Sequence, residues 1–360
     1  MAGRRIRVLD LGVVPPLRSQ ACYHAAAYAM NEYTPDTIIL VSPASPYVCI
    51  GFHQDAVKEV DLEYCRDRGL LVSRREVGGG AVYLDAGQLF VQWVFHPASL
   101  PESIEDKFRC FIKPMVQTYR SLGINAVQRP VNDIHVAGKK IGGTGAAAVG
   151  RAEVAVGSFM FDFDRAAMAR VLRVPSEKMR DKIHRSLESY MTTMKDELGA
   201  VPERTEVKNL YLRAASECLQ AEMIPGEWTE REEWEARRLE ELFRSPEWLF
   251  QKGSLRREAV RIHEGVEVSE ADYKTPGGLL RATLRRRDGL IDGLWLSGDF
   301  TLEPRAAVEA VERRLVGLPA ERAAIVAAVE EVYRRMMIRS PGLEPADWAA
   351  AVLKAAGLEP

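Results

Sequence analysis

Long apolar runs are missing from this sequence. No stretch reaches the roughly 18 apolar residues that a membrane-spanning helix needs, and no apolar leader follows the arginines near the start. A surplus of basic charge is missing too, because the formal net charge is −2 and no basic block stands out. We therefore expect a cytoplasmic protein that works without a membrane and without nucleic acid.

Cysteine is scarce and scattered. The five cysteines form no C-x-x-C pair and the six histidines show no metal-ligand spacing, so neither a zinc site nor a disulfide framework is expected. The chain also lacks G-x-S-x-G, the P-loop and G-x-G-x-x-G, which argues against a hydrolase serine and two common phosphate-binding loops. We expect each cysteine to be a small core residue rather than a nucleophile.

The length of 360 residues and the hydrophobic content of 47% fit a globular protein of two domains. Composition changes around Ser245–Gly253, so we expect one domain over residues 1–250 and a second over 251–360. The end of the first, residues 175–250, is expected to be mainly helical. The second begins with expected strands at Leu255–His263, Gly278–Arg286 and Leu290–Leu296 and continues with helices, which is typical of a small α+β domain.

A candidate β-hairpin runs from Asn132 to Gly150, N-D-I-H-V-A-G-K-K-I-G-G-T-G-A-A-A-V-G. Gly138-Lys139 suits a type II′ turn, which has glycine at its first central position. That register pairs Ala137 with Lys140, and faces alternate along each strand. The predicted polar face holds Asp133, His135, Lys140 and Thr144, and the core face holds Ile134, Val136 and Ile141.

Lys140 is the candidate catalytic residue. A cation fixed beside a developing negative charge is worth about 10²–10³ in rate, and Asp133 is placed to hold Mg²⁺ or to fix the lysine. A solvated turn lysine beside a strand-edge salt bridge is the alternative, and the residues alone leave both open. The small residues from Gly142 to Ala148 suggest a mobile loop or a place where a ligand lies against the backbone, and a flexible surface loop is the alternative.

A second candidate site is the run of three glycines at Gly78–Gly80, between two expected strands. Glycines let backbone N–H groups approach an anion without hindrance from a Cβ atom. The preceding Arg74 and Arg75 carry the charge that a phosphate or carboxylate ligand needs. A tight connection between strands with two solvated arginines is the alternative.

Together these segments resemble the lipoate-protein ligase A family in its two-domain form. The resemblance lies in R-R-E-V-G-G-G-A-V-Y-L-D at Arg74–Asp85, in N-D-I-H-V-A-G-K-K-I-G-G at Asn132–Gly143, in Y-V-C-I-G-F-H-Q at Tyr47–Gln54, and in Leu290–Pro304. It implies an α+β protein, with a mixed β-sheet catalytic domain of the biotin/lipoate protein ligase type and a smaller α+β accessory domain at the C-terminus.

The resemblance also implies an activity. Family members activate lipoate or octanoate with ATP and Mg²⁺ to acyl-AMP, and then pass the acyl group to a lysine of a lipoyl carrier domain. The carrier stays open between a 2-oxoacid dehydrogenase subunit, an H protein and another lipoyl-binding protein. The choice between lipoate and octanoate stays open too.

Carried over residue by residue, the resemblance makes Lys140 catalytic. The implied ATP and adenylate site holds Arg75, Gly79, Gly80, Val82, Tyr83, Asn132, Asp133 and Lys140. The implied lipoate site holds Arg75, Gly80, Leu84, Gly142 and Gly143. Asp133 is the implied Mg²⁺ ligand.

Many relatives carry histidine where this chain has Leu84 and Val156, which is compatible with a changed acyl preference, altered adenylate handling or a divergent carrier. Three alternatives are kept. An ATP-independent octanoyl or lipoyl transferase has the same fold but lacks the accessory domain. A biotin protein ligase would need a Gly-Arg-Gly-Arg-x-Gly loop, which the sequence does not have. A non-catalytic binding protein has the two missing histidines as its only support.

Overall fold

The computed structural model describes residues 4–129, 131–174, 176–252 and 266–359. Contacts divide the chain into two compact units. The first comprises Met1–Cys49, Asp61–Ser73 and Val82–Ser245, and the second comprises Ile50–Val60, Arg74–Ala81 and Pro246–Pro360. The triple-glycine segment therefore groups with the C-terminal part of the chain. The domain boundary at residue 250 stays a prediction, and the expected strand Leu255–His263 lies outside the described residues.

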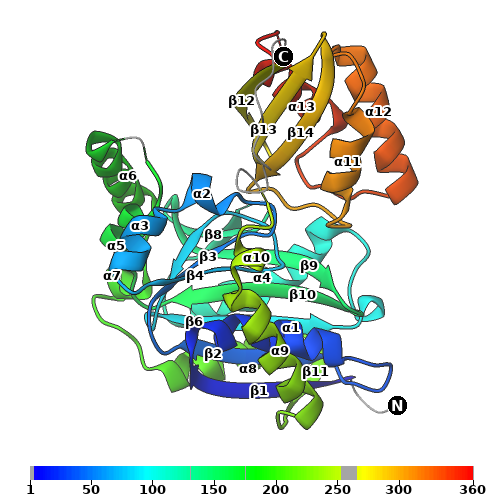
Figure 1. The fold of residues 1–360 in the computed structure, drawn as a ribbon. Helices are drawn as coiled ribbons and strands as arrows, with labels where there is room; N and C mark the ends of the chain where they lie inside the picture. The colour runs from blue at the N-terminus through cyan, green and yellow to red at the C-terminus, as the bar shows by residue number, and fades with distance from the viewer. Residues whose placement is uncertain (1–3, 130, 175, 253–265, 360) are drawn as a thin grey trace. The chain divides into compact units, whose positions relative to one another are not determined.

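The first unit is built on an eight-stranded mixed sheet with the strand order β11-β1-β2-β6-β10-β9-β8-β7 (Figure 1). β1 runs parallel to its neighbours β2 and β11, and the other neighbouring pairs are antiparallel. β2 (Thr37–Pro43) and β6 (Gln88–Phe95) are buried along their whole length, because helices cover both faces. The other strands are β1 (Arg4–Val14), β7 (Val127–Arg129), β8 (Asp133–Val136), β9 (Lys139–Val149), β10 (Ala152–Met160) and β11 (Ala221–Pro225).

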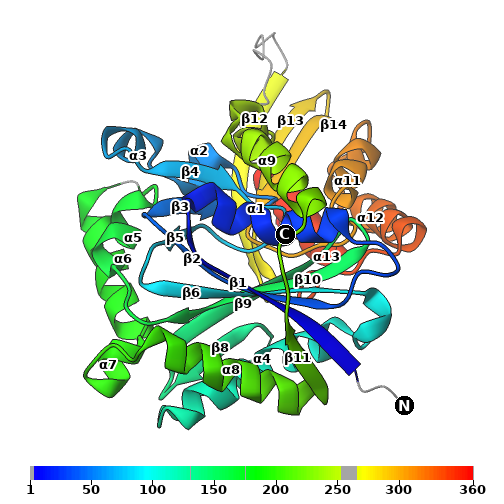
Figure 2. The ribbon, with the colours of Figure 1, turned by 90° about the horizontal axis from the view of Figure 1, so that it is seen from below.

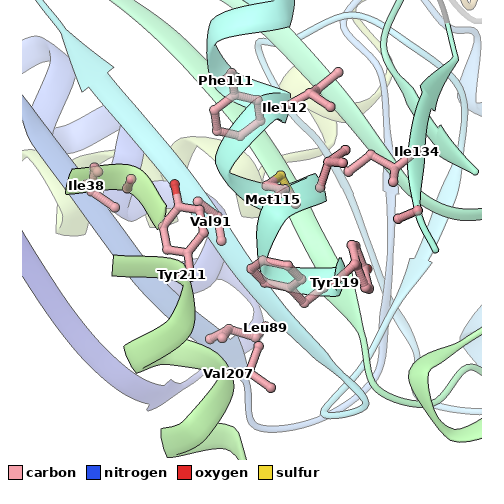
Figure 3. Close-up of a cluster of buried hydrophobic side chains, with 14 of the residues drawn as sticks. Ile38, Leu89, Val91, Phe111, Ile112, Met115, Tyr119, Ile134, Val207 and Tyr211 are labelled. Carbon is pink, nitrogen blue, oxygen red and sulfur yellow. The ribbon is translucent and has the colours of Figure 1, made fainter. Parts of the chain in front are cut away.

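Two pairs of helices cover this sheet (Figure 2). α1 (Pro16–Ala29) and α9 (Glu230–Arg244) lie together on one face, and α4 (Ile104–Ser121) and α8 (Arg204–Leu219) lie together on the other. α4 is amphipathic, so its apolar side chains pack inward while its charged ones remain at the surface. The core between α4, α8 and the sheet includes Phe111, Ile112, Met115, Tyr119, Val207, Tyr211, Ile38, Leu89, Val91 and Ile134 (Figure 3).

A smaller sheet has the order β4-β3-β5. Its strands are β3 (Tyr47–Ile50), β4 (Leu71–Arg74) and β5 (Val82–Leu84). α3 packs against α5, and α5 packs against β5. The remaining helices of the first unit are α3 (Leu62–Asp67), the 3-10 turn η1 (Pro97–Ser99), α5 (Arg165–Val171), α6 (Glu177–Tyr190) and α7 (Met194–Leu198).

The second unit contains an antiparallel sheet of three strands, β12 (Val266–Thr275), β13 (Gly278–Arg287) and β14 (Leu290–Gly298). Three helices, α11 (Ala307–Leu315), α12 (Arg322–Met336) and α13 (Pro345–Ala355), pack with it around a core of their own (Figure 1). Phe300 and Trp348 are fully buried in that core. The short helices α2 (Ala56–Glu59) and α10 (Pro246–Leu249) complete the unit.

The predicted α+β class is confirmed, since a large mixed sheet with flanking helices accompanies a smaller strand-then-helix part. Three strands were missed, β7, β11 and β12, of which β7 is only three residues long. β11 interrupts the segment that was predicted to be mainly helical, and its partner β1 lies at the far end of the chain, where no local pattern announces it. β12 was missed because its ten residues include four charged ones and only a short apolar alternation.

Arg18 joins α1 to α9 through two carboxylates. Its Nη1 donates to Glu233 at 2.6 Å, and its Nε donates to Glu240 at 2.5 Å. The hydrogen bond from Arg18, supported by Arg237 and Trp228, lowers the pKa of Glu233 to about 2. Helix α9 is therefore held on α1 by charge as well as by packing.

Replacing Arg18 by Gln should lower the free energy of unfolding by about 1 kcal/mol at neutral pH, because the pairs are partly exposed. A carboxyl with a depressed folded pKa stabilises the fold above its unfolded pKa of about 4.3 and loses that contribution as the pH falls below it. Urea unfolding of both proteins near neutral pH and near pH ~3 measures the difference, which should shrink in acid. The same difference at both pH values would contradict this account.

Candidate functional site

β8 and β9 meet at a two-residue turn formed by Ala137 and Gly138. Both residues have positive φ, +47° and +85°, as a type I′ turn requires, and Val136 pairs with Lys139 across it. The predicted turn at Gly138-Lys139 is therefore wrong by one residue. A single glycine was the only signal, and glycine suits the second central position of a type I′ turn as well as the first of a type II′ turn.

A β-bulge follows the turn on β9. His135 pairs with Lys140 and Ile134 pairs with Gly142, so Ile141 is the extra residue. Moving the turn by one residue shifts the pairing by two positions, so His135 and Lys140 keep the shared face that was predicted. Ile134 and Ile141 are fully buried, as predicted for the core face.

The extra residue of the bulge reverses which residues of β9 point to each face of the sheet from Gly142 onward. Asp133 therefore pairs with Gly143 and not with Thr144. The prediction that Thr144 shares the polar face is consequently wrong. Thr144 is buried, and its hydroxyl donates to the carbonyl of Asn132 at 2.8 Å. The side-chain amide of Asn132 in turn donates from Nδ2 to the carbonyl of Thr144 at 2.9 Å, which fixes the residue that precedes β8.

The hairpin brings Lys140 and Asp133 together, as the face pattern predicted. Nζ of Lys140 lies 2.8 Å from Oδ1 of Asp133, the distance of a charge-assisted hydrogen bond. The two side chains are 28% and 22% exposed, so the pair is held against the strands and stays accessible to a ligand. The neighbouring Lys139 is exposed at the turn.

Gly143 makes room for this pair. A Cβ atom on Gly143 would lie 3.0 Å from both Cε and Nζ of Lys140, whereas one on Gly142 would face the core, 3.4 Å from the carbonyl of Ser158 and 3.6 Å from Ile134. The lysine side chain therefore occupies the space that Gly143 leaves. The loop expected from Gly142 to Ala148 is wrong, because these residues belong to β9, where Gly142 and Gly143 pair with β8 and residues 144–148 pair with β10. A ligand against this backbone stays a prediction.

His135 is a neighbour of the pair that was predicted to share its face but was not proposed as a site residue. Its ring is buried, with Nδ1 3.2 Å from the carbonyl of Gly138 and Nε2 3.8 Å from Oδ2 of Asp133. The Nε2 atom has no hydrogen-bond partner among the residues that the structure describes. Tyr190 packs edge-on against the ring at 5.7 Å. The alternation that placed His135 beside Lys140 was the signal available in the sequence.

Hydrogen bonds from neighbouring segments fix the backbone of β9 at Lys140 and Ile141. The hydroxyl of Tyr119 donates to the carbonyl of Ile141 at 3.0 Å, and the amide of Thr192 donates to the carbonyl of Lys140 at 2.9 Å. Burial raises the pKa of Tyr119 far above its ordinary value, so the phenol keeps its proton. The backbone of Lys140 is thus fixed from α4 and from the segment after α6.

The triple-glycine segment, in the second unit, is shaped by its own arginine. Nη2 of Arg75 donates to the carbonyls of Gly78 and Gly80 at 2.8 and 2.9 Å. Gly79 between them has φ +90°, a conformation that favours glycine. Arg75 is 9% exposed, so the alternative of a solvated arginine is wrong at this position.

Arg74 is fully buried in the same unit and contacts backbone rather than solvent. Its guanidinium donates to the carbonyls of Gly51, Phe52, Gln54, Trp248 and Leu249. These bonds occupy all three of its nitrogen atoms. The expectation that Arg74 neutralises a ligand therefore fails, because its donors are committed to the fold.

β5 supplies three more of the expected residues, and it pairs with β3 in the first unit. Tyr83 and Leu84 are buried, and Val82 is half-buried. Burial, with Asp85 and Asp164 nearby, raises the pKa of Tyr83 to about 12, so the phenol is neutral. Leu84 pairs with Tyr47 and presents an apolar side chain.

The expected site residues thus fall into three groups. The hairpin gathers Asn132, Asp133, Lys140, Gly142 and Gly143, while β5 carries Val82, Tyr83 and Leu84. Arg75, Gly79 and Gly80 belong to the second unit, and their membership of one site with Lys140 stays a prediction.

Two kinds of feature are absent from the described residues. No group of three or more His, Cys, Asp or Glu residues is arranged to hold a metal ion among them. None of the helices in the described ranges is long and apolar enough to cross a membrane.

Residues 16–216 match the family model of the lipoyl protein ligase A/B catalytic domain. The match covers more than half of the 360 residues, and the chain belongs to this family. The protein is an enzyme of the lipoate ligase and octanoyltransferase class.

Three relatives illustrate the range of that class. Lipoate-protein ligase A subunit 1 of Thermoplasma acidophilum is 33% identical over 265 residues, which is 71% of this chain and 99% of that protein. Octanoyltransferase LipM of Kyrpidia tusciae is 29% identical over 249 residues, 63% of this chain and 90% of that protein. Lipoate-protein ligase LplJ of Bacillus subtilis is 26% identical over 306 residues, 85% of this chain and 88% of that protein.

Solved structures of lipoate-protein ligases have a similar fold. One chain comes from a structural analysis of an archaeal lipoylation system, a bipartite lipoate protein ligase and its E2 lipoyl domain from T. acidophilum. It has a TM-score of 0.62 at 30% identity and covers 71% of this chain and 98% of its own length. A crystal structure of lipoate-protein ligase A bound with ATP has a TM-score of 0.60 at 27% identity, covering 68% of this chain and 98% of that one.

Replacing Gly143 by Ala should lengthen the Lys140–Asp133 contact without unfolding the protein. The new methyl group would lie 3.0 Å from Nζ, and the flexible lysine is the part that is able to move. A partly exposed ion pair contributes at most about 1 kcal/mol, so the loss of stability should be small. A crystal structure of the variant measures the Nζ–Oδ1 distance. Retention of the present 2.8 Å beside the new methyl would contradict this account.

Proposed function

We propose that the protein is an ATP-dependent lipoate-protein ligase. It converts lipoate or octanoate and ATP into acyl-AMP and pyrophosphate, and then transfers the acyl group to a lysine of a lipoyl carrier domain. The observation that carries the proposal is the Lys140 ammonium, held by Asp133 on a fixed hairpin in a chain of this family. The relative bound with ATP and the relative described with an E2 lipoyl domain support the two substrates.

In the first step a carboxylate oxygen of the acid attacks the α-phosphorus of ATP, and the bond from that phosphorus to the pyrophosphate oxygen breaks. Negative charge grows on the α-phosphate oxygens as this happens. The Lys140 ammonium supplies positive charge there, and the contact with Asp133 positions it before the substrates arrive. One such positioned donor is worth about 10²–10³ in rate.

In the second step the carrier amine attacks the acyl carbonyl carbon, the bond to the AMP oxygen breaks, and the amine loses a proton. The carbonyl oxygen gains negative charge at that moment. Lys140 lies on a partly exposed strand surface, where a carrier side chain has access to it. The same ammonium therefore serves both steps.

The remaining assignments follow from the character of each group. For ATP and the adenylate we propose Arg75, Gly79, Gly80, Val82, Tyr83, Asn132 and Asp133, together with Lys140. For the acyl chain we propose Arg75, Gly80, Leu84, Gly142 and Gly143. Leu84 is buried and apolar, as the lining of an acyl-chain site requires.

Asp133 fits a Mg²⁺ ligand, because Lys140 engages Oδ1 and leaves Oδ2 without a hydrogen bond from it. Mg²⁺ is commonly held by one or two carboxylates together with substrate phosphates and water. When bound there, the ion would neutralise phosphate charge. Asp133 would then serve two cations, the metal through one oxygen and the lysine through the other.

An ATP-independent octanoyltransferase is the second candidate, since LipM of K. tusciae is 29% identical. The extent of the matches favours the ligase. The LipM match takes in 63% of this chain, whereas the B. subtilis ligase match takes in 85% and so includes part of the C-terminal segment.

The cysteines favour the ligase as well. A cysteine nucleophile reacts as the thiolate, which burial in apolar surroundings disfavours. Burial raises the pKa of Cys22 to about 12 and that of Cys65 to about 11, and it also raises those of Cys110 and Cys218. Cys49 is fully buried.

Replacing Lys140 by Ala should slow pyrophosphate release in the presence of lipoate and Mg-ATP by about 10²–10³. Lys139→Ala is the matched control, because it removes the same charge from the exposed turn one residue away. A coupled pyrophosphate assay on both variants, with a thermal melt to verify folding, makes the measurement. Full activity of the Lys140→Ala protein would remove this mechanism.

Alkylation with iodoacetamide should leave acylation of a lipoyl-domain carrier unchanged, because no thiol takes part in the proposed reaction. The mass of the carrier, read after incubation with octanoate and ATP, measures this. Parallel reactions contain octanoyl carrier protein as donor and no nucleotide. Transfer in those reactions that is lost on alkylation would favour the transferase and contradict the ligase.

A further inference from the structure

The ring of His135 is buried beside the Lys140–Asp133 pair, and one of its nitrogen atoms is left over. The side chain is 3% exposed, and Nε2 has no hydrogen-bond partner among the residues that the structure describes. Buried polar atoms in folded proteins almost always have a partner, and a bound ion is one of the partners that account for an exception. Nε2 of His135 therefore marks a candidate ligand atom.

The other ring nitrogen fixes how His135 is able to bind. Nδ1 lies 3.2 Å from the carbonyl oxygen of Gly138, and because a carbonyl only accepts hydrogen bonds, Nδ1 carries a proton and donates it. In the neutral ring, Nε2 then presents a lone pair. Metal-binding histidines almost always have this arrangement, in which one nitrogen binds the metal and the other donates to a backbone carbonyl, a carboxylate or water. The turn at Gly138 thus orients the ring as a metal site requires.

Asp133 supplies a second ligand atom on the same side of β8. Residues two apart on a strand share a face, and Oδ2 of Asp133 lies 3.8 Å from Nε2 of His135. Bonds from a metal ion to nitrogen and oxygen ligands are about 2.0–2.2 Å long, so one ion is able to contact both atoms. Lys140 engages the other oxygen, Oδ1, at 2.8 Å. Asp133 is 22% exposed, so an ion has access to the pair from the carboxylate side.

An ion pair between Asp133 and a doubly protonated His135 is the other explanation of these distances. At 3.8 Å it leaves the proton on Nε2 without an acceptor, because hydrogen bonds from nitrogen to oxygen are about 2.7–3.2 Å long. An ion bound between the two atoms gives a partner to each of them. The metal site therefore accounts for the unpartnered nitrogen, and the ion pair does not.

We propose that Nε2 of His135 and Oδ2 of Asp133 together bind the divalent cation that accompanies ATP, and that His135 makes this site favour a first-row transition-metal ion such as Co²⁺ over Mg²⁺. This deepens the proposed function, in which Asp133 holds that cation. Imidazole is a ligand for transition metals, whereas Mg²⁺ prefers oxygen ligands. Water and substrate phosphates complete the coordination, as at other sites where the protein supplies few ligands.

Metal binding to the full-length protein, freed of metal with EDTA and kept without ATP, tests the inference. Calorimetry with Co²⁺ alone and with Mg²⁺ alone should show that Co²⁺ binds at least about tenfold more tightly. The ¹H NMR spectrum of the Co²⁺ form should contain one strongly shifted resonance, from the hydrogen on Nδ1, that disappears in D₂O. That resonance is the signature of a histidine bound through Nε2.

Three variants assign the nitrogen. His135→Gln should weaken Co²⁺ binding at least about tenfold and abolish the shifted resonance. Mg²⁺ binding should stay within about threefold, because an amide oxygen is a ligand that this ion accepts. His184→Gln is the matched control, since Nδ1 of His184 also lies 3.8 Å from a carboxylate, that of Glu188, but at the surface, and it should change neither measurement. His135→Leu, whose side chain suits a buried position, should also lose the Co²⁺ preference, and it replaces His135→Gln if that variant does not fold.

Equal affinities of the wild-type protein for the two ions, or no Co²⁺ binding, would overturn the inference in favour of the ion pair. So would Co²⁺ binding that survives both His135 substitutions, or that falls as much in His184→Gln, because the metal would then be bound elsewhere. None of these measurements requires turnover. A wild-type protein that binds Co²⁺ as predicted but releases no pyrophosphate would contradict the proposed function alone.

Discussion

The ion pair between Asp133 and Lys140 is the contact on which the account depends. A lysine on a strand surface ordinarily moves through many rotamers in water, and a positioned charge is useful only if that freedom is already lost. The bulge at Ile141 creates the position. Without it, Asp133 would pair with Gly142, and Gly143 would point to the opposite face and leave no space for the folded-back lysine.

The fold class and the shared face of Asp133 and Lys140 were predictable, because alternation of apolar and polar residues survives a small error in the turn. The identity of the residue that pairs with Asp133 was not predictable. A bulge adds one residue without changing composition, so Thr144 was placed on the wrong face. Strand β11 was not predicted because its partner β1 is remote in the sequence. Arg74 was taken for a ligand because a sequence does not reveal which backbone carbonyls surround a guanidinium.

Both units are made of segments that are separate in the sequence, so a single domain boundary does not describe them. Residues 50–60 and 74–81 are far from the C-terminus in sequence, yet they pack with it. The hairpin and the triple-glycine segment are each fixed by contacts within their own unit. Tyr119 and Thr192 hydrogen-bond to the backbone of the hairpin. Arg75, Gly51 and the backbone at Phe300 contact the triple-glycine segment. In the proposed reaction the first supplies a fixed cation, and the second supplies the backbone that shapes the nucleotide site.

The path of a carboxylate oxygen tests the central claim most directly. If the acid is activated as acyl-AMP, octanoate labelled with ¹⁸O in both carboxylate positions must leave one labelled oxygen on AMP after the carrier is acylated. Mass spectrometry of the AMP from a single reaction with ATP, Mg²⁺ and an apo lipoyl-domain carrier measures this. We predict one ¹⁸O in each AMP formed with acylated carrier. Carrier acylation accompanied by unlabelled AMP, or by no AMP, would contradict the account.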